Sequence, residues 1–325
     1  MSVRKLCALV LLLCAAGFGL FAQEAPAEAP LVDRYAQVFD RTGDQGKLVA
    51  RFLKLSLGAD SEPGSGDKSG DSTILISPDG KVMLIDAGSP ECGPQVEAAL
   101  RALGVSKLDA VVASHPHVDH IGGLAQILAD FPVDTLYLSK VTYPTSTFGY
   151  FLAAAKKRAG SLVYLEEGSS FDFGSSVKVQ VFNPEKDIVY YDGYPSNSTQ
   201  FINNKSLVLK FTYREASMLF MGDVYTPREA DLIEKFGDQL KADVIKVGHH
   251  GAETSSSKSF VRTVSPKVAV MMHDSFASLQ VYKNYRKVGA LTYATAIDGC
   301  VKVAIDAAKN FTVVAQFDRL SDFLN

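Results

Sequence analysis

Three of the six histidines in this chain fall within one six-residue window, and imidazole is a common ligand of metal ions in proteins. The window reads His115-Pro116-His117-Val118-Asp119-His120 and follows an apolar run at residues 108–113. Imidazole nitrogens and carboxylate oxygens are ligands that zinc and neighbouring divalent cations accept, and four of them share one predicted strand-to-helix turn. The spacing therefore predicts a metal site with hydrolytic chemistry.

The other three histidines also follow apolar runs. His249 and His250 come after residues 243–248, and His273 comes after residues 268–272. Loops at the carboxyl ends of strands in layered α/β folds converge on a crevice where ligands bind. We therefore expect all six histidines near one site, against the alternatives of a polar loop that happens to be rich in histidine and of isolated core histidines.

The window resembles the His-x-His-x-Asp-His signature of the metallo-β-lactamase superfamily, and neighbouring segments are similar to that family in the same order. Residues 72–88 read as a hairpin that ends in Asp86-Ala87-Gly88. Residues 217–223 and 246–251 are similar to the later ligand segments. The resemblance covers residues 46–306 and implies an α/β fold, a four-layer αββα sandwich of the metallo-β-lactamase type.

A subgroup of this family, the soluble hydrolase domain of the ComEC DNA-uptake competence proteins, is similar in more detail. The segments that carry this resemblance are Asn203-Asn204-Lys205-Ser206, Met221-Gly222-Asp223 and His249-His250-Gly251. Two departures concern the substrate side: Ala252 stands where the subgroup has serine, and residues 273–276 replace a Gly-x-Asn and His-Pro stretch.

The resemblance implies a centre for two divalent metal ions, zinc or manganese, with a metal-bound hydroxide as the nucleophile. The expected ligands are His115 and His117 for the first ion, Asp119, His120 and His249 for the second, and Asp223 as the bridge between them. Catalytic roles are expected for Asp119, Asp223 and His250.

Further side chains are expected around the ligands. Adjacent residues at a strand end point apart, so we expect His249 to bind metal and His250 to support the site or contact substrate. Asp86 is expected to orient a ligand histidine. Asn203 stands where many relatives supply a third histidine to the first ion. The remaining candidates are Ser206 and Lys246 as phosphate contacts, with an edge charge as the alternative for Lys246, and His273 as an acid, a substrate contact or a plain pocket histidine.

The expected substrate is a phosphodiester, meaning a nucleic acid or a nucleotide, because paired metal ions suit in-line displacement and because of the ComEC-like segments. Hydrolysis of a lactam, lactone or thioester is the enzymatic alternative, and a catalytically weak binding or scaffold protein is the other. The formal net charge is −3, so any contact with a polyanion would have to be local.

The N-terminus predicts export. Arg4-Lys5 followed by an apolar run at residues 6–21 is typical of an export signal, which we place at residues 1–22. A spacer at 23–45 and a hydrolase domain at 46–325 would follow, in the periplasm or outside the cell. A retained anchor that tethers the chain to the envelope is the alternative. No later apolar run is long enough to cross a membrane, and the oligomeric state is not indicated.

Composition and periodicity are consistent with one large layered domain. The chain has 325 residues, 47% of them hydrophobic, which allows a sizeable core. Outside the expected signal it keeps two cysteines, Cys92 and Cys300, whose pairing is open. The elements expected from the patterns are strands at 48–57, 135–139 and within 161–182, helices at 93–104, 122–131 and 150–159, and a surface insertion at 58–70.

Overall fold

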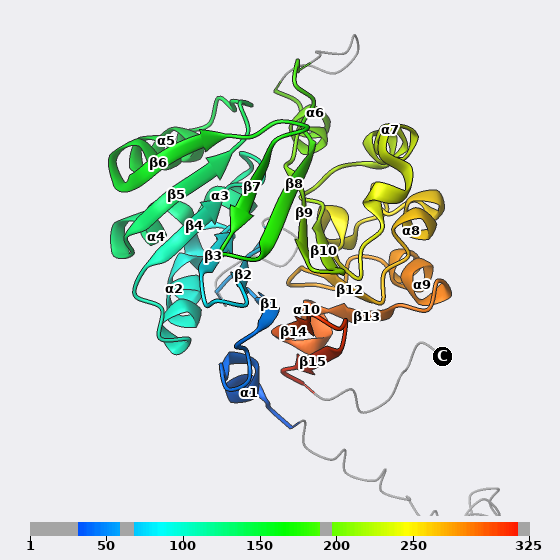
Figure 1. Ribbon diagram of the computed structural model, residues 1–325. Helices are drawn as coiled ribbons and strands as arrows, with labels where there is room; N and C mark the ends of the chain where they lie inside the picture. The colour runs from blue at the N-terminus through cyan, green and yellow to red at the C-terminus, as the bar shows by residue number, and fades with distance from the viewer. Residues whose placement is uncertain (1–31, 59–67, 189–196, 318–325) are drawn as a thin grey trace, which may run out of the picture. The chain divides into compact units, whose positions relative to one another are not determined.

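The computed structural model describes residues 32–58, 68–188 and 197–317, which form two β-sheets with helices on their outer faces (Figure 1). The expected export signal lies outside the described residues. One sheet has eight strands in the order β15-β14-β1-β2-β3-β4-β5-β6, and the other has seven in the order β13-β12-β11-β10-β9-β8-β7.

In the eight-stranded sheet, β3, β4, β5 and β6 run parallel to one another, and the remaining neighbours pair antiparallel. Its strands are β1 Lys47–Phe52, β2 Thr73–Ile76, β3 Val82–Ile85, β4 Leu108–Val112, β5 Val133–Leu138, β6 Ala159–Tyr164, β14 Val301–Asp306 and β15 Phe311–Ala315.

In the seven-stranded sheet, β10, β11, β12 and β13 run parallel, and β7, β8, β9 and β10 form an antiparallel meander. Its strands are β7 Ser170–Phe173, β8 Val177–Asn183, β9 Val208–Tyr213, β10 Ala216–Phe220, β11 Val244–Lys246, β12 Val268–Met271 and β13 Leu291–Ala294. Each sheet thus places the carboxyl ends of several parallel strands at one edge, where ligand-binding loops gather.

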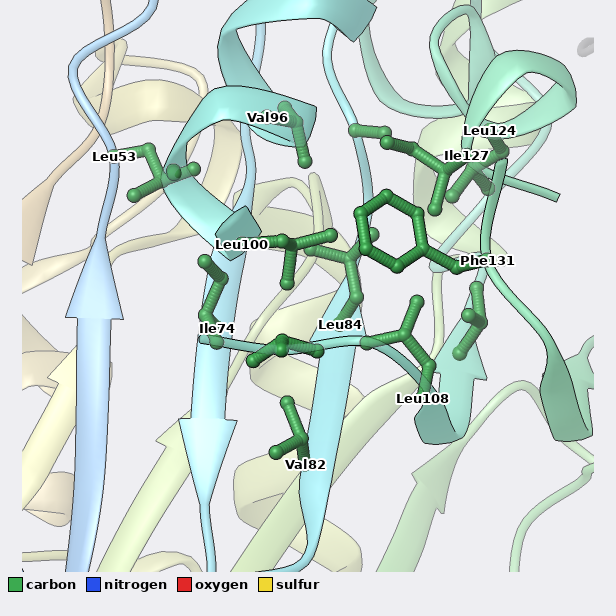
Figure 2. Close-up of a cluster of buried hydrophobic side chains, with 14 of the residues drawn as sticks. Leu53, Ile74, Val82, Leu84, Val96, Leu100, Leu108, Leu124, Ile127 and Phe131 are labelled. Atoms are coloured by element: carbon green, nitrogen blue, oxygen red, sulfur yellow. The ribbon is translucent and has the colours of Figure 1, made fainter. Parts of the chain in front are cut away.

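Three buried apolar clusters separate four layers, because alternate strand residues point to opposite faces of a sheet. Leu75 and Phe220 belong to the cluster between the two sheets, whereas Ile74 belongs to the cluster under the helices of the first sheet. Figure 2 shows Leu100 of α2 in that outer cluster. Leu232 of α7 belongs to the third cluster, on the second sheet. The predicted αββα sandwich is confirmed.

The helices that cover the sheets lie between the strands in sequence. Their bounds are α2 Gly93–Ala102, α4 Leu124–Asp130 and α5 Ser146–Arg158 in the first half, and α7 Thr226–Phe236, α8 Lys258–Val264 and α9 Leu279–Lys287 in the second. Shorter helices are α1 Tyr35–Phe39, α3 Val118–Ile121, α6 Thr199–Asn204 and α10 Thr295–Asp298, with 3-10 turns at Pro90–Cys92, Gly237–Leu240 and Gly248–Gly251.

Several predicted boundaries shift for local reasons. The expected strand at 48–57 already ends at Phe52. The helix expected at 150–159 begins at Ser146, because the side chain of Thr145 accepts a hydrogen bond from Phe148 N and caps it. The helix expected at 122–131 begins at Leu124 and is preceded by the separate short helix α3.

Two expectations about loops differ from the structure. The predicted surface insertion at 58–70 lies partly outside the described residues, but its last residues are not on the surface. Ser69 and Asp71 are buried: Ser69 O accepts a hydrogen bond from Ser89 N at 2.9 Å, and Asp71 N donates to Asp119 O at 3.1 Å. Within the expected spacer at 23–45, Val38 and Phe39 of α1 are buried as well.

Cys92 and Cys300 are both buried free thiols. Among the helices of the described residues, none combines the length and the apolar character that a bilayer span requires.

Candidate metal centre

The His-x-His-x-Asp-His window connects β4 to α3 at the carboxyl end of a parallel strand. His115 and His120 are buried, and His117 is partly exposed. His115 Nε2 lies 3.0 Å from His117 Nδ1, so the two rings present nitrogens to one point. The other nitrogen of His115, Nδ1, lies 3.0 Å from Ser114 Oγ, which fixes the ring orientation. These two histidines can therefore bind one cation together.

Asp86 holds the start of this window in place. It follows β3 with a left-handed backbone, φ 59°, and is buried. Its Oδ1 accepts a hydrogen bond from Ser114 N at 2.7 Å, and its Oδ2 lies 2.6 Å from Ser114 Oγ and 2.8 Å from His120 Nδ1. The contact with His120 is the one expected of an orienting carboxylate, and it leaves His120 Nε2 free to face the centre of the cluster.

Asp223 lies at that centre. It follows β10 and the close turn at Gly222, where an added Cβ would lie 2.5 Å from Ser206 Cβ. Ser206 Oγ accepts a hydrogen bond from Asp223 N at 3.0 Å. Asp223 Oδ2 is 3.2 Å from His120 Nε2 and 3.8 Å from His115 Nε2. The carboxylate thus stands between the two groups of nitrogens.

His250, rather than His249, points into this cluster. Its Nε2 lies 3.2 Å from both Asp119 Oδ2 and Asp223 Oδ2. His249 instead pairs through Nδ1 with Thr254 Oγ1 and faces the cleft. The period-two rule of an extended strand does not apply here, because both histidines lie in a turn and have a left-handed, non-helical backbone, with φ 43° and 56°.

The chemistry of the assembled groups fits a divalent cation. Ligand atoms of Asp71, His120, Asp223 and His250 all lie within 4.8 Å of one another, and all four residues are buried. Within the described part of the chain, His250 Nε2, Asp223 Oδ1 and Asn203 Oδ1 are buried without a hydrogen-bond partner. Buried polar atoms without partners are costly, and a bound cation would satisfy such acceptors.

The pKa shifts of the buried histidines also fit a site for a cation. Burial alone would lower the pKa of His120, yet the carboxylates of Asp223 and Asp86 raise it to about 10. Burial is likewise outweighed at His250, where Asp223 and Asp71 hold the pKa well above its ordinary value. Burial lowers the pKa of His115. The carboxylates therefore favour positive charge on the two innermost rings, and a metal ion would supply that charge to neutral imidazoles.

The remaining predicted site residues lie around this core. Asn203 is buried and donates from Nδ2 to Tyr225 OH at 3.2 Å. Lys246 is buried in β11, which pairs with β10 and β12 on its two sides, so its interpretation as an edge charge is wrong. The ring of His273 lies 5.5 Å from that of His250, and its Nδ1 lies 2.7 Å from Asp274 Oδ1.

A cleft of about 1190 Å³ opens on the cluster. His117, Asp119, Asn203, Asp223 and His249 contribute to its wall next to the ligand atoms. The rest of the lining includes Lys68, Glu91, Gln95, Tyr143 and the hydroxyl side chains of Ser56, Ser89, Thr145, Thr147 and Thr199. Lys246 and Ser206 do not belong to this lining; they lie behind the cluster.

Asp71 is the buried residue of the cluster that sequence reasoning missed. It stands two residues before the start of β2, after a stretch of sequence rich in glycine and serine. Its neighbour Gly70 has φ 80°, and an added Cβ would lie 1.6 Å from Asp119 O. The feature of the sequence that could have indicated Asp71 is a carboxylate between a glycine and an apolar strand.

Part of the chain matches a known protein family. The model of the metallo-beta-lactamase superfamily matches residues 66–201 of the chain. The chain carries a metallo-beta-lactamase domain. The matched segment contains Asp71, Asp86 and the His115–His120 window, whereas Asp223 and His250 lie beyond it.

Curated relatives of the metallo-beta-lactamase domain confirm the ComEC-like resemblance. ComE operon protein 3 of Bacillus subtilis (strain 168) is 28% identical over 172 residues, covering 53% of this chain and 21% of that protein. Competence protein ComA of Neisseria gonorrhoeae is 28% identical over 199 residues, covering 61% of this chain and 25% of that protein. The chain thus spans a quarter or less of the length of these two relatives.

A solved structure shares the fold of the metallo-beta-lactamase domain at low sequence identity. The CmlA beta-hydroxylase E377D mutant superposes with a TM-score of 0.50 at 13% identity, covering 80% of this chain and 54% of that chain. This likeness concerns the fold alone.

Proposed function

We propose that this protein is a metal-dependent hydrolase of phosphodiesters with a centre for two divalent cations, zinc or manganese. One observation carries the proposal: the position of Asp223. Its Oδ2 lies 3.2 Å from His120 Nε2 and His250 Nε2 and 3.8 Å from His115 Nε2, so one carboxylate stands between two groups of ligand atoms. A bridging carboxylate of this kind is what a paired-cation site needs.

The proposed ligands differ from the sequence expectation at one position. They are His115 and His117 for the first cation, Asp119, His120 and His250 for the second, and Asp223 for both. His250 takes the place expected of His249, because its unpartnered Nε2 faces the cluster. Asn203 Oδ1, also buried and unpartnered, is the candidate third ligand of the first cation.

When bound, two such cations lower the pKa of a water molecule and stabilise the attacking and leaving oxygens of an in-line displacement. The chain's own residues supply orientation. Asp86 holds His120 through Nδ1, and Ser206 holds the backbone of Asp223. Because these supporting groups are buried and hydrogen-bonded, the ligands are held in place before substrate arrives.

The substrate class is supported by the relatives and by the cleft. One relative is named a competence protein, and hydroxyl side chains such as Thr145 and Thr199 can donate hydrogen bonds to phosphate oxygens. Among described residues lining the cleft, Lys68 is the sole lysine or arginine, and Glu91 lies in the same wall. A cleft with so little positive charge fits a short phosphodiester segment better than a long polyanion.

The test is hydrolysis of a thymidine dinucleotide, single-stranded DNA and duplex DNA in zinc, manganese and magnesium. We expect metal-dependent cleavage by the parent and its loss in Asp223→Ala. Asp243→Asn is the control, because Asp243 is another buried aspartate and its carboxylate accepts a hydrogen bond from Ser217 N outside the cluster. Cleavage of lactones or thioesters with no phosphodiester cleavage would favour an acyl hydrolase, and a parent that binds no metal would favour a scaffold.

Salt dependence adds a second readout. One phosphate contact through Lys68 predicts that affinity for single-stranded DNA falls by about 2- to 3-fold between 50 and 200 mM salt, whereas six to ten contacts would give about 10²- to 10⁴-fold. Lys68→Ala should remove most of the small effect. A steep salt dependence would contradict the short-segment proposal while leaving the metal chemistry intact.

Export belongs to the same proposal. The basic start at Arg4-Lys5 and the apolar run at residues 6–21 support a signal at 1–22. We expect N-terminal sequencing of the protein from the producing cell's envelope or medium to begin near residue 23. Recovery from the cytoplasm with an intact N-terminus would contradict it.

A further inference from the structure

A buried lysine lies behind the metal cluster, in contact with two of its carboxylates. Lys246 ends β11, in the interior of the seven-stranded sheet, and its side chain is only 5% exposed. Its Nζ forms an ion pair with Asp71 Oδ2, donates a hydrogen bond to Gly222 O at 3.0 Å and lies 3.6 Å from Asp223 Oδ1. A buried ammonium is costly unless it is paired and hydrogen-bonded, and here it is both.

Asp71 reaches the same point from the eight-stranded sheet. Its backbone N donates to Asp119 O at 3.1 Å, and its carbonyl accepts from Gly88 N at 2.9 Å, so the main chain is fixed on both sides. Its Oδ1 lies 2.9 Å from His250 Nδ1. One oxygen of Asp71 thus faces His250 and the other forms an ion pair with Lys246, so we assign Asp71 a supporting role in the cluster.

We propose that the Asp71–Lys246 ion pair positions the cluster from behind, Asp71 by fixing the ring of His250 and Lys246 by holding Asp71 and the Oδ1 side of Asp223. With Nδ1 of His250 engaged by Asp71, its Nε2 is directed at Asp119 and Asp223. The pair links the two sheets, since Asp71 precedes β2 and Lys246 ends β11. Carboxylates behind metal-binding histidines set the ring's tautomer and orientation in this way.

This inference rests on the proposed metal centre, and its test separates the two. The variants are Asp71→Asn, Lys246→Met and the double variant. The probe is Co²⁺, whose binding and visible spectrum report affinity and coordination, and unfolding by denaturant is measured without metal. The matched controls are Asp44→Asn and Lys302→Met, because Lys302 and Asp44 form another ion pair, at 2.6 Å, whose partners are less than 10% exposed.

Lys246→Met should destabilise the metal-free protein, because it leaves a buried carboxylate without its cation. Adding Asp71→Asn should recover part of that stability, since both charges are then gone. Co²⁺ affinity should stay about 10- to 100-fold below that of the parent in the double variant, with an altered spectrum, because the carboxylate behind His250 is missing. The controls should change stability without changing Co²⁺ affinity.

Two results would overturn the inference. A double variant that binds Co²⁺ with the parent's affinity and spectrum would make the ion pair merely structural, with the metal centre still standing. A parent that binds no Co²⁺ would remove the metal centre itself, and the positioning role with it.

Discussion

The Oδ2 atom of Asp86 lies 2.8 Å from Nδ1 of His120, and the opposite nitrogen of the same ring lies 3.2 Å from Asp223 Oδ2. Each ring nitrogen of His120 thus has a carboxylate partner, Asp86 on one side and Asp223 of the candidate metal centre on the other. The arrangement fixes the ring without any contribution from the cleft.

Removing the support should weaken metal binding. We expect Asp86→Asn to lower zinc affinity by about 10- to 100-fold, because the amide no longer holds His120 with a charged acceptor. Isothermal titration with zinc measures this. Asp243→Asn is the matched control, since Asp243 accepts from Ser217 N and contacts Ser217 Oγ much as Asp86 does with Ser114. Equal losses in both variants would mean that Asp86 acts only on stability.

The two adjacent histidines should behave differently. His250→Ala is expected to reduce zinc affinity beyond the about 10- to 100-fold typical of supporting residues, because Nε2 faces Asp119 and Asp223. His249→Ala is expected to keep metal content and to alter the Michaelis constant, since His249 lines the cleft. Metal analysis of the purified variants distinguishes them. The reverse pattern would restore the assignment made from sequence alone.

Gly70 should be irreplaceable for steric reasons. A Cβ there would lie 1.6 Å from Asp119 O, so Gly70→Ala is expected to displace the loop that carries Asp119. Overpacking of this kind costs about 1–3 kcal/mol in the free energy of unfolding. Gly43→Ala is the control for the cost of placing alanine at a positive φ. Gly43 has a similar φ, 79°, but no heavy atom lies within 4 Å of an added Cβ there. The free energy of unfolding is measured by chemical denaturation. Equal losses in Gly70→Ala and Gly43→Ala would contradict the predicted clash with Asp119 O.

Glu229, which lies outside the candidate metal centre, should make the free energy of unfolding depend on pH. Burial raises the pKa of Glu229 from 4.5 to about 7, although the N–H groups of Ser256 and Ser257 donate to the carboxylate and favour its charged form. The folded state therefore binds this proton more tightly than the unfolded state does. The resulting contribution to the free energy of unfolding, on the order of 3 kcal/mol, is present below pH 4.5 and is lost as pH rises through 7.

Glu229→Gln provides the comparison, because glutamine stays neutral throughout. The difference in unfolding free energy between parent and variant should move in favour of the variant between pH 5 and 8. A difference that stays constant over that interval would show that Glu229 titrates at its ordinary pKa.

The sequence was sufficient to predict those helices, strands and motifs that depend on local patterns of residues. The spacing of the His115–His120 window after an apolar strand, and the hairpin that ends at Asp86, were sufficient to predict a shared site. The periodicity of residues 93–104 predicted α2, which the structure has at Gly93–Ala102. These features depend on neighbours along the chain, so one sequence contains them.

What sequence reasoning missed depends on contacts between distant segments. The choice between His249 and His250 is decided by a turn in which both have positive φ, a conformation that no alternation rule describes. Asp71 and Lys246 lie 175 positions apart in sequence and become partners only when the two sheets pack. Burial of a lysine cannot be predicted from sequence in such a case, because the desolvation cost of its charge is offset by a partner from another sheet.

Anomalous X-ray diffraction from crystals grown with manganese would show directly whether Asp223 lies between two cations. We expect two peaks on either side of Asp223, one beside His115 Nε2 and His117 Nδ1 and the other beside His250 Nε2. A single peak that contacts His249 instead, or none within the cluster of Asp71, His120, Asp223 and His250, would contradict this expectation.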